Sequence, residues 1–143
     1  MINRRKFLLN SSSAFALTQL PSNAYAKNGI KHYRLVAEAA EHTFYPSAQK
    51  SKLSLYNQQS PGPTIHAVKD DILEVEFLNL LDEPTTIHWH GIRNLNDMDG
   101  VPGLTQPAVE PGETFTYRFP LNDTGLFWYH AHTQAWKQVT KGL

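Results

Sequence analysis

Cysteine is absent from the 143-residue chain. This absence excludes disulfide bonds, thiolate metal ligands and a cysteine nucleophile. The chain also lacks net charge, because 13 lysines and arginines balance 13 acidic residues. Without excess positive charge there is no electrostatic basis for binding nucleic acid or an anionic membrane surface. The apolar runs are too short to cross a bilayer, so neither nucleic acid nor membrane is an expected partner.

Histidine, by contrast, occurs in an unusual pattern. Four of the seven histidines form two H-x-H pairs, His88 and His90 in TTIHWHGIR and His130 and His132 in LFWYHAHTQ. In a β-strand, residues i and i+2 point to the same side, so each pair projects two imidazoles together. If the two strands are neighbours, four imidazoles converge on one small volume. Imidazole nitrogens suit borderline divalent metals, copper and zinc above all, and the pairs therefore predict a metal site.

The other histidines and the serines give weaker signals. His32 and His42 lie in a polar stretch and are expected to be solvated, and His66 is expected on the surface of a strand. No G-x-S-x-G nucleophile turn is present, so a serine hydrolase is not supported. A zinc hydrolase remains an alternative for the paired histidines, because such a site combines histidine ligands with a nearby acid. Asp99 could be that acid.

Short β-capable segments separated by turns fill the chain from Ile30 onward. The segment DILEVEFLN alternates between apolar and polar side chains, as a strand with one buried face does. Nine prolines, mostly in turn clusters such as DMDGVPG, argue against long helices. The strands are expected at residues 33–39, 52–68 (two strands around a Pro-Gly-Pro turn), 71–79, 85–91, 113–119 and 126–132. This pattern predicts an all-β fold, a Greek-key sandwich or barrel.

One helix is expected, at the very end of the chain. In TQAWKQVTKGL, the residues Trp136, Val139 and Leu143 are spaced to line one helical face. Gly142 is expected to be a cap or turn residue there.

Residues 1–26 have the pattern of an export signal. A basic start and a mildly apolar middle precede Ala24-Tyr25-Ala26, which matches the A-x-A cleavage pattern, with cleavage expected after Ala26. Arg4 and Arg5, followed by Lys6-Phe7-Leu8, resemble the twin-arginine signal of bacterial export. An ordinary secretory signal is the alternative. We therefore expect a periplasmic or secreted protein whose mature part is residues 27–143.

Several motifs in order resemble one protein family. They are HWHG, DGVP, TQ with a following proline, PGETFTY and WYHAH. Together, over about residues 30–143, they resemble the first plastocyanin-like domain of the multicopper oxidases, a family that includes laccases and ascorbate oxidase. The resemblance implies a cupredoxin-like Greek-key β-sandwich or barrel. It also implies copper as the cofactor, because in that family a trinuclear copper cluster lies between the first and last domains and is held by H-x-H pairs.

The resemblance also implies a role for each paired histidine. His88 would bind the type 2 copper, His90 and His130 would share one type 3 copper, and His132 would bind the other. Asp99 matches a family acid near the cluster that supports proton delivery or orients water and histidines.

Two parts of the family's machinery have no counterpart in the chain. The type 1 copper, which takes electrons from a reducing substrate, needs a cysteine, and the chain has none. The histidine pairs of the last domain are also lacking. In relatives, the sequence after Gly142-Leu143 continues into a strand that completes the first domain, so we expect a truncated domain that misses its closing strand. Such a domain is expected to be marginally stable, to oligomerise or to need a partner that supplies the remaining cupredoxin domains.

The sequence leaves three functional hypotheses. The first is the copper-binding N-terminal domain of an exported, laccase-like multicopper oxidase, which supplies half of the cluster's histidines and has no complete active site of its own. The second is a non-enzymatic periplasmic copper-binding protein. The third is a cupredoxin-like scaffold without metal, which is disfavoured because all four paired histidines are present.

Overall fold

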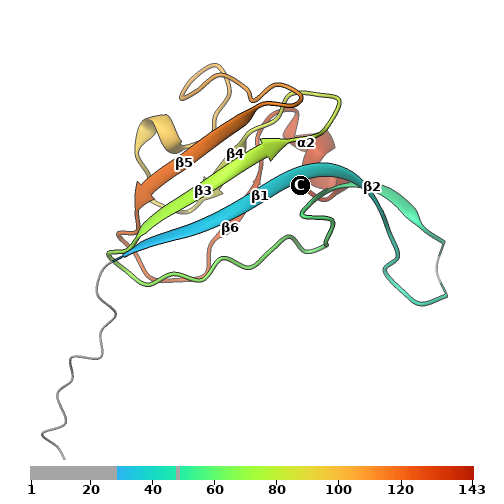
Figure 1. Ribbon diagram of the computed structural model, residues 1–143, viewed down its shortest axis with the longest axis horizontal. Helices are drawn as coiled ribbons and strands as arrows, with labels where there is room; N and C mark the ends of the chain where they lie inside the picture. The colour runs from blue at the N-terminus through green and yellow to red at the C-terminus, as the bar shows by residue number, and fades with distance from the viewer. Residues whose placement is uncertain (1–28, 48) are drawn as a thin grey trace, which may run out of the picture.

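The computed structural model describes residues 29–47 and 49–143, and within them the chain is built mainly of β-strands (Figure 1). The expected all-β fold is confirmed. The proposed signal, residues 1–26, lies outside the described residues. No helix in the described part is long and apolar enough to cross a membrane. The elements are β1 (Ile30–His42), β2 (Ser51–Tyr56), β3 (Ile72–Asn79), β4 (Ile87–His90), a 3-10 turn (Asn96–Met98), β5 (Thr114–Pro120), β6 (Trp128–Ala131), α2 (Ala135–Gln138) and a second 3-10 turn (Val139–Lys141).

A four-stranded sheet in the order β2-β1-β3-β5 forms one layer. Strand β1 runs antiparallel to β2 and parallel to β3, and β3 runs antiparallel to β5. The alternation expected in β3 is confirmed, since Leu73, Val75 and Phe77 are at most 2 % exposed. Between them, Glu74 points away from the core and pairs with Arg118 of β5. Each fully buried apolar side chain contributes about 1.5–3 kcal/mol, so this face of β3 is a main source of stability.

A two-stranded sheet of β4 and β6 forms the second layer. Trp89 of β4 is 2 % exposed and joins the two layers. Its ring lies edge-on to Tyr117 and Phe119 of β5, with centroids 5.5 and 5.2 Å away. The hydroxyl of Tyr117 accepts a hydrogen bond from the backbone N–H of Ile87 at 2.8 Å. The strand that bears the first histidine pair is thereby fixed to the larger sheet from its buried side.

Two expectations about local structure were wrong. The segment after the Pro-Gly-Pro turn, residues 64–68, is not a strand. Its backbone is bonded to a side chain instead, because the Tyr33 hydroxyl donates to the His66 carbonyl and accepts from the His66 N–H.

The terminal helix exists, but α2 is only one turn long. Trp136 does not line a buried face and is 78 % exposed. Leu143 is buried, and Gly142 has the left-handed conformation of a turn residue, with φ of 113°.

The two layers do not close into a barrel. Between them lies an open apolar groove of about 710 Å³, lined by residues of both sheets and by the end of the chain. Leu73, Trp89, Tyr129 and Leu143 form part of its wall. Leu126, which also lines it, is fully exposed. An exposed apolar surface of this kind is typical of a face that another polypeptide covers.

Candidate metal centre

The two histidine pairs are brought together by one strand pairing. Strands β4 and β6 are antiparallel, with His88 opposite His130 and His90 opposite Trp128. Because side chains alternate along a strand, His88, His90 and His130 share one face of this small sheet, while Trp89 occupies the other. His132 follows directly after β6, and its N–H donates to the Thr86 carbonyl at 3.3 Å.

The four imidazoles converge, as the spacing predicts. The ligand nitrogens of His88, His90 and His130 all lie within 4.8 Å of one another. The ring of His132 is 5.2 Å from that of His88 and 6.2 Å from that of His130, centroid to centroid. His132 therefore belongs to the cluster through its ring contact with His88, although only His88, His90 and His130 have ligand nitrogens that all lie within 4.8 Å of one another.

Hydrogen bonds to carbonyl oxygens fix the tautomers of two histidines. The Nδ1 of His88 is 2.7 Å from the Asp99 carbonyl oxygen, and the Nδ1 of His130 is 2.9 Å from the Ala131 carbonyl oxygen. A carbonyl oxygen only accepts, so each Nδ1 carries the proton and each Nε2 keeps a lone pair. This is the usual arrangement of a metal-binding histidine, in which one ring nitrogen is held by a backbone carbonyl and the other faces the metal.

A distance between two facing nitrogens tests whether these residues fit a metal ion. The Nδ1 of His90 lies 3.2 Å from the Nε2 of His130. Two nitrogens bound to one ion at about 2.0–2.1 Å, at a tetrahedral angle, are separated by about 3.3 Å. The observed distance agrees with that value, and the imidazole donors suit copper or zinc.

The cluster favours a neutral imidazole at His130. Burial lowers the pKa of His130, and the neighbouring His88, His90 and His132 lower it further, while the hydrogen bond to Ala131 partly opposes the shift. A metal ligand must be unprotonated. Burial and the three neighbouring imidazoles therefore prepare His130 to bind a cation.

Asp99 lies beside the cluster, and its backbone makes the closest contact there. Its side-chain Oδ1 is 3.5 Å from the Nδ1 of His88, farther than its own carbonyl oxygen.

The next residue, Gly100, has φ of 78°, and a Cβ built on it would lie 1.8 Å from the Ile87 carbonyl oxygen. Only glycine permits this approach to β4, so Gly100 is a site residue that the spacing of the histidines alone does not reveal.

Trp128 covers one side of the cluster. Its ring centroid is 4.1 Å from that of His130 and 5.6 Å from that of His90, and it is 54 % exposed. The next residue, Tyr129, lies opposite Trp89 and faces the other side of the small sheet. Its hydroxyl donates to the Pro63 carbonyl at 2.8 Å.

The remaining histidines do not join the cluster. His32 pairs with Glu74 on an exposed face, at 2.9 Å between Nδ1 and Oε1. His42 is half-buried and lies edge-on to Phe44. His66 is exposed, as expected, although on a loop and not on a strand.

Comparison with known proteins defines the class of this β-sheet protein with a histidine cluster. The family model described as "Multicopper oxidase" matches residues 38–143. The chain therefore belongs to the multicopper oxidase family.

Relatives and solved structures agree with the family assignment. The chain is 43 % identical over 116 residues to Laccase-1 of Emericella nidulans, covering 77 % of the chain and 19 % of that protein. It is 36 % identical over 141 residues to multicopper oxidase mco of Staphylococcus haemolyticus, covering 94 % of the chain and 31 % of that protein. The crystal structure of a multi-copper oxidase from Pseudomonas thermotolerans superposes with a TM-score of 0.78 at 42 % identity, over 82 % of this chain and 28 % of that one. The chain thus spans less than a third of the length of these proteins. The superposition on a multicopper oxidase structure confirms the cupredoxin-like fold.

Proposed function

We propose that this chain is the copper-binding N-terminal domain of a laccase-like multicopper oxidase. The observation that carries the proposal is the pair of facing nitrogens, Nδ1 of His90 and Nε2 of His130, which are 3.2 Å apart, close to the separation of about 3.3 Å for two ligands of one ion. Family membership favours copper over zinc, and the tautomers fixed at His88 and His130 support a ligand role for each.

Each histidine has its own part in this proposal. His90 and His130 would share one copper of the type 3 pair, and His132, which is not among the three histidines whose ligand nitrogens lie within 4.8 Å of one another, would bind the other. His88 binds the type 2 copper through Nε2. The copper cluster supplies the reduction of dioxygen to water when it is complete and supplied with electrons. The backbone carbonyl oxygen of Asp99 orients the His88 ring, and the carboxylate of the same residue lies beside that ring, where it would support proton delivery to the cluster.

Other parts of a complete enzyme must complement this chain. No cysteine is present for a type 1 copper, and Trp128, the side chain that covers one side of the cluster, is itself half exposed. We propose that further cupredoxin domains cover this face and the apolar groove, and that they supply the remaining copper ligands and the electron path. We further propose that residues 1–26 direct twin-arginine export, so that the enzyme acts in the periplasm or outside the cell.

Oxygen consumption separates this function from that of a copper carrier. The copper-loaded protein, mixed with the remaining domains of a related oxidase, is expected to consume dioxygen with a phenolic donor, and without those domains it is expected to bind copper with no turnover. His88→Ala should abolish the complemented activity, whereas His66→Ala, a histidine remote from the cluster, should leave it unchanged. Copper uptake with no turnover in any mixture would instead support a non-enzymatic copper-binding protein.

A further inference from the structure

A buried glutamine joins the segment after the second histidine pair to the segment before the first. Gln138, in α2, is 0 % exposed. Its Oε1 accepts a hydrogen bond from the Thr85 hydroxyl at 2.8 Å, and its Nε2 donates to the Pro84 carbonyl at 3.0 Å. Both ends of the amide are thus bonded to a segment that ends at Thr86, two residues before His88.

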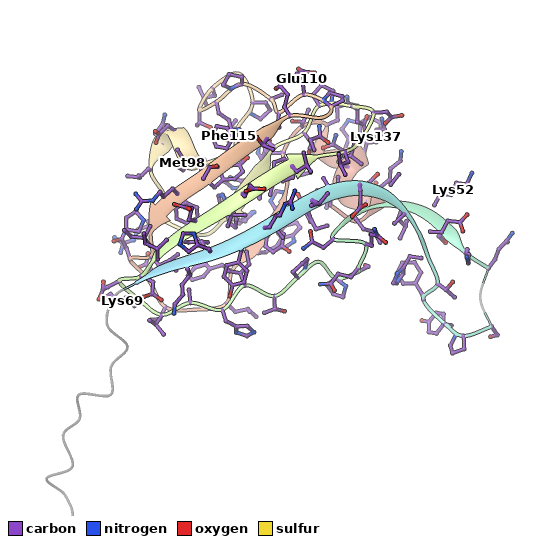
Figure 2. All side chains as sticks on the ribbon, in the orientation of Figure 1. Lys52, Lys69, Met98, Glu110, Phe115 and Lys137 are labelled. Atoms are coloured by element: carbon purple, nitrogen blue, oxygen red, sulfur yellow. The ribbon has the colours of Figure 1, made fainter. Side chains whose placement is uncertain are left out.

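A second contact also holds α2 against the segment before β4. Lys137 of α2, labelled in Figure 2, forms an ion pair with Glu83. The lysine holds the pKa of the Glu83 carboxyl below its usual range. Two neighbouring residues of α2 therefore fasten the helix to residues 83–85 through one charged and two neutral contacts.

Of the four paired histidines, His132 is the one whose position depends most on these contacts of α2. His88, His90 and His130 lie within β4 or β6, but His132 follows the end of β6. Between it and α2, Gln134 adopts a left-handed conformation with φ of 45°. A single helical turn is not stable by itself, so the contacts of Gln138 and Lys137 hold α2 in place. Through the short turn they act on His132 together with the hydrogen bond from the His132 N–H to the Thr86 carbonyl.

We infer that Gln138 is a positioning residue for His132, acting by holding α2 against Thr85 and Pro84. The expected effect of Gln138 on copper binding rests on the proposed function, in which His132 is a copper ligand. The inference that Gln138 fixes the position of His132 does not depend on that function. Residues around a metal ligand that fix its orientation change metal affinity by about 10–100-fold when replaced. The same range is expected here, from a residue that lies six positions from His132 and belongs to no metal-binding motif.

Amide hydrogen exchange tests the geometric claim without metal. In Gln138→Leu and in Thr85→Val, the exchange rate of the His132 amide, divided by that of the Val75 amide of β3, is expected to rise about tenfold. The Val75 amide serves as the reference because a general loss of stability would speed up exchange at both amides, whereas local opening speeds it up only at His132. Thr85→Ser, which keeps the hydroxyl, should restore the wild-type ratio. Thr140→Ala, on the same helical segment but bonded only to the Trp136 and Lys137 carbonyls, should leave it unchanged. An unchanged ratio in Thr85→Val would overturn the inference even if Gln138→Leu does not fold.

Copper binding tests whether the effect passes through His132. Titration with copper alone should show about tenfold weaker binding of one copper in Thr85→Val than in wild type, and no further loss when Thr85→Val is added to His132→Ala. An equal loss in both backgrounds would show a general structural effect and contradict the inference. If wild type binds no copper, the proposed function fails, while the exchange ratio still decides the role of Gln138.

Discussion

Replacing Gly100 with alanine is expected to lower the free energy of unfolding by about 2–5 kcal/mol and to disrupt copper binding. A non-glycine residue in the left-handed region costs about 1–2 kcal/mol. The added Cβ also meets the Ile87 carbonyl oxygen at 1.8 Å, and overpacking of this kind costs about 1–3 kcal/mol more. Relief of the clash moves the 99–100 backbone away from β4, so His88 loses the carbonyl that fixes its tautomer.

A second glycine in the same loop provides the control. Gly103 has nearly the same conformation, with φ of 75°, but nothing lies within 4 Å of a Cβ built there. Gly103→Ala should therefore show only the conformational cost, about 1–2 kcal/mol, with copper binding retained. Urea unfolding and copper titration of both variants provide the comparison. Equal losses in the two variants would mean that the close approach of Gly100 to β4 has no special role.

Trp89→Ala is expected to cost about 3–5 kcal/mol, the range for removing a large aromatic side chain from a core. Trp89 is 2 % exposed and packs on Tyr117, Phe119 and Tyr129. Since folded domains are stable by about 5–15 kcal/mol, this loss is a large part of the total. Because Trp89 lies directly between His88 and His90, the cluster is expected to lose its geometry as the core loosens.

Trp136→Ala is the matched control for Trp89→Ala. Trp136 is 78 % exposed, and surface substitutions usually change stability by less than about 0.5 kcal/mol. Thermal unfolding followed by circular dichroism measures both. A loss at Trp136 as large as that at Trp89 would contradict the division into a buried and an exposed tryptophan.

Much of the metal centre follows from local sequence periodicity. The i, i+2 spacing of His88 with His90 places both rings on one face, and the alternation of β3 places Leu73, Val75 and Phe77 in the core. These features depend only on the geometry of a single strand. For that reason they could be predicted without knowing how the strands are arranged.

Features that depend on distant partners could not be predicted in this way. The glutamine amide of Gln138 is bonded to Thr85, which lies 53 residues away, and nothing in its own neighbourhood indicates that contact. Gly100 resembles any turn glycine until β4 is placed against it. The segment around His66 has the composition of a strand, but the Tyr33 hydroxyl takes its backbone bonds. In each case a tertiary contact outweighs the local pattern.

The central claim is that the two H-x-H pairs hold copper at the face of the β4–β6 sheet, and copper content measures it most directly. Wild-type protein and the double variant His130→Ala/His132→Ala are loaded with copper, desalted and assayed for metal per chain, with His32→Ala/His66→Ala as the control. Bound copper is expected in wild type and in the control, and most of it is expected to be lost in the double variant. Equal copper in all three proteins would contradict the account.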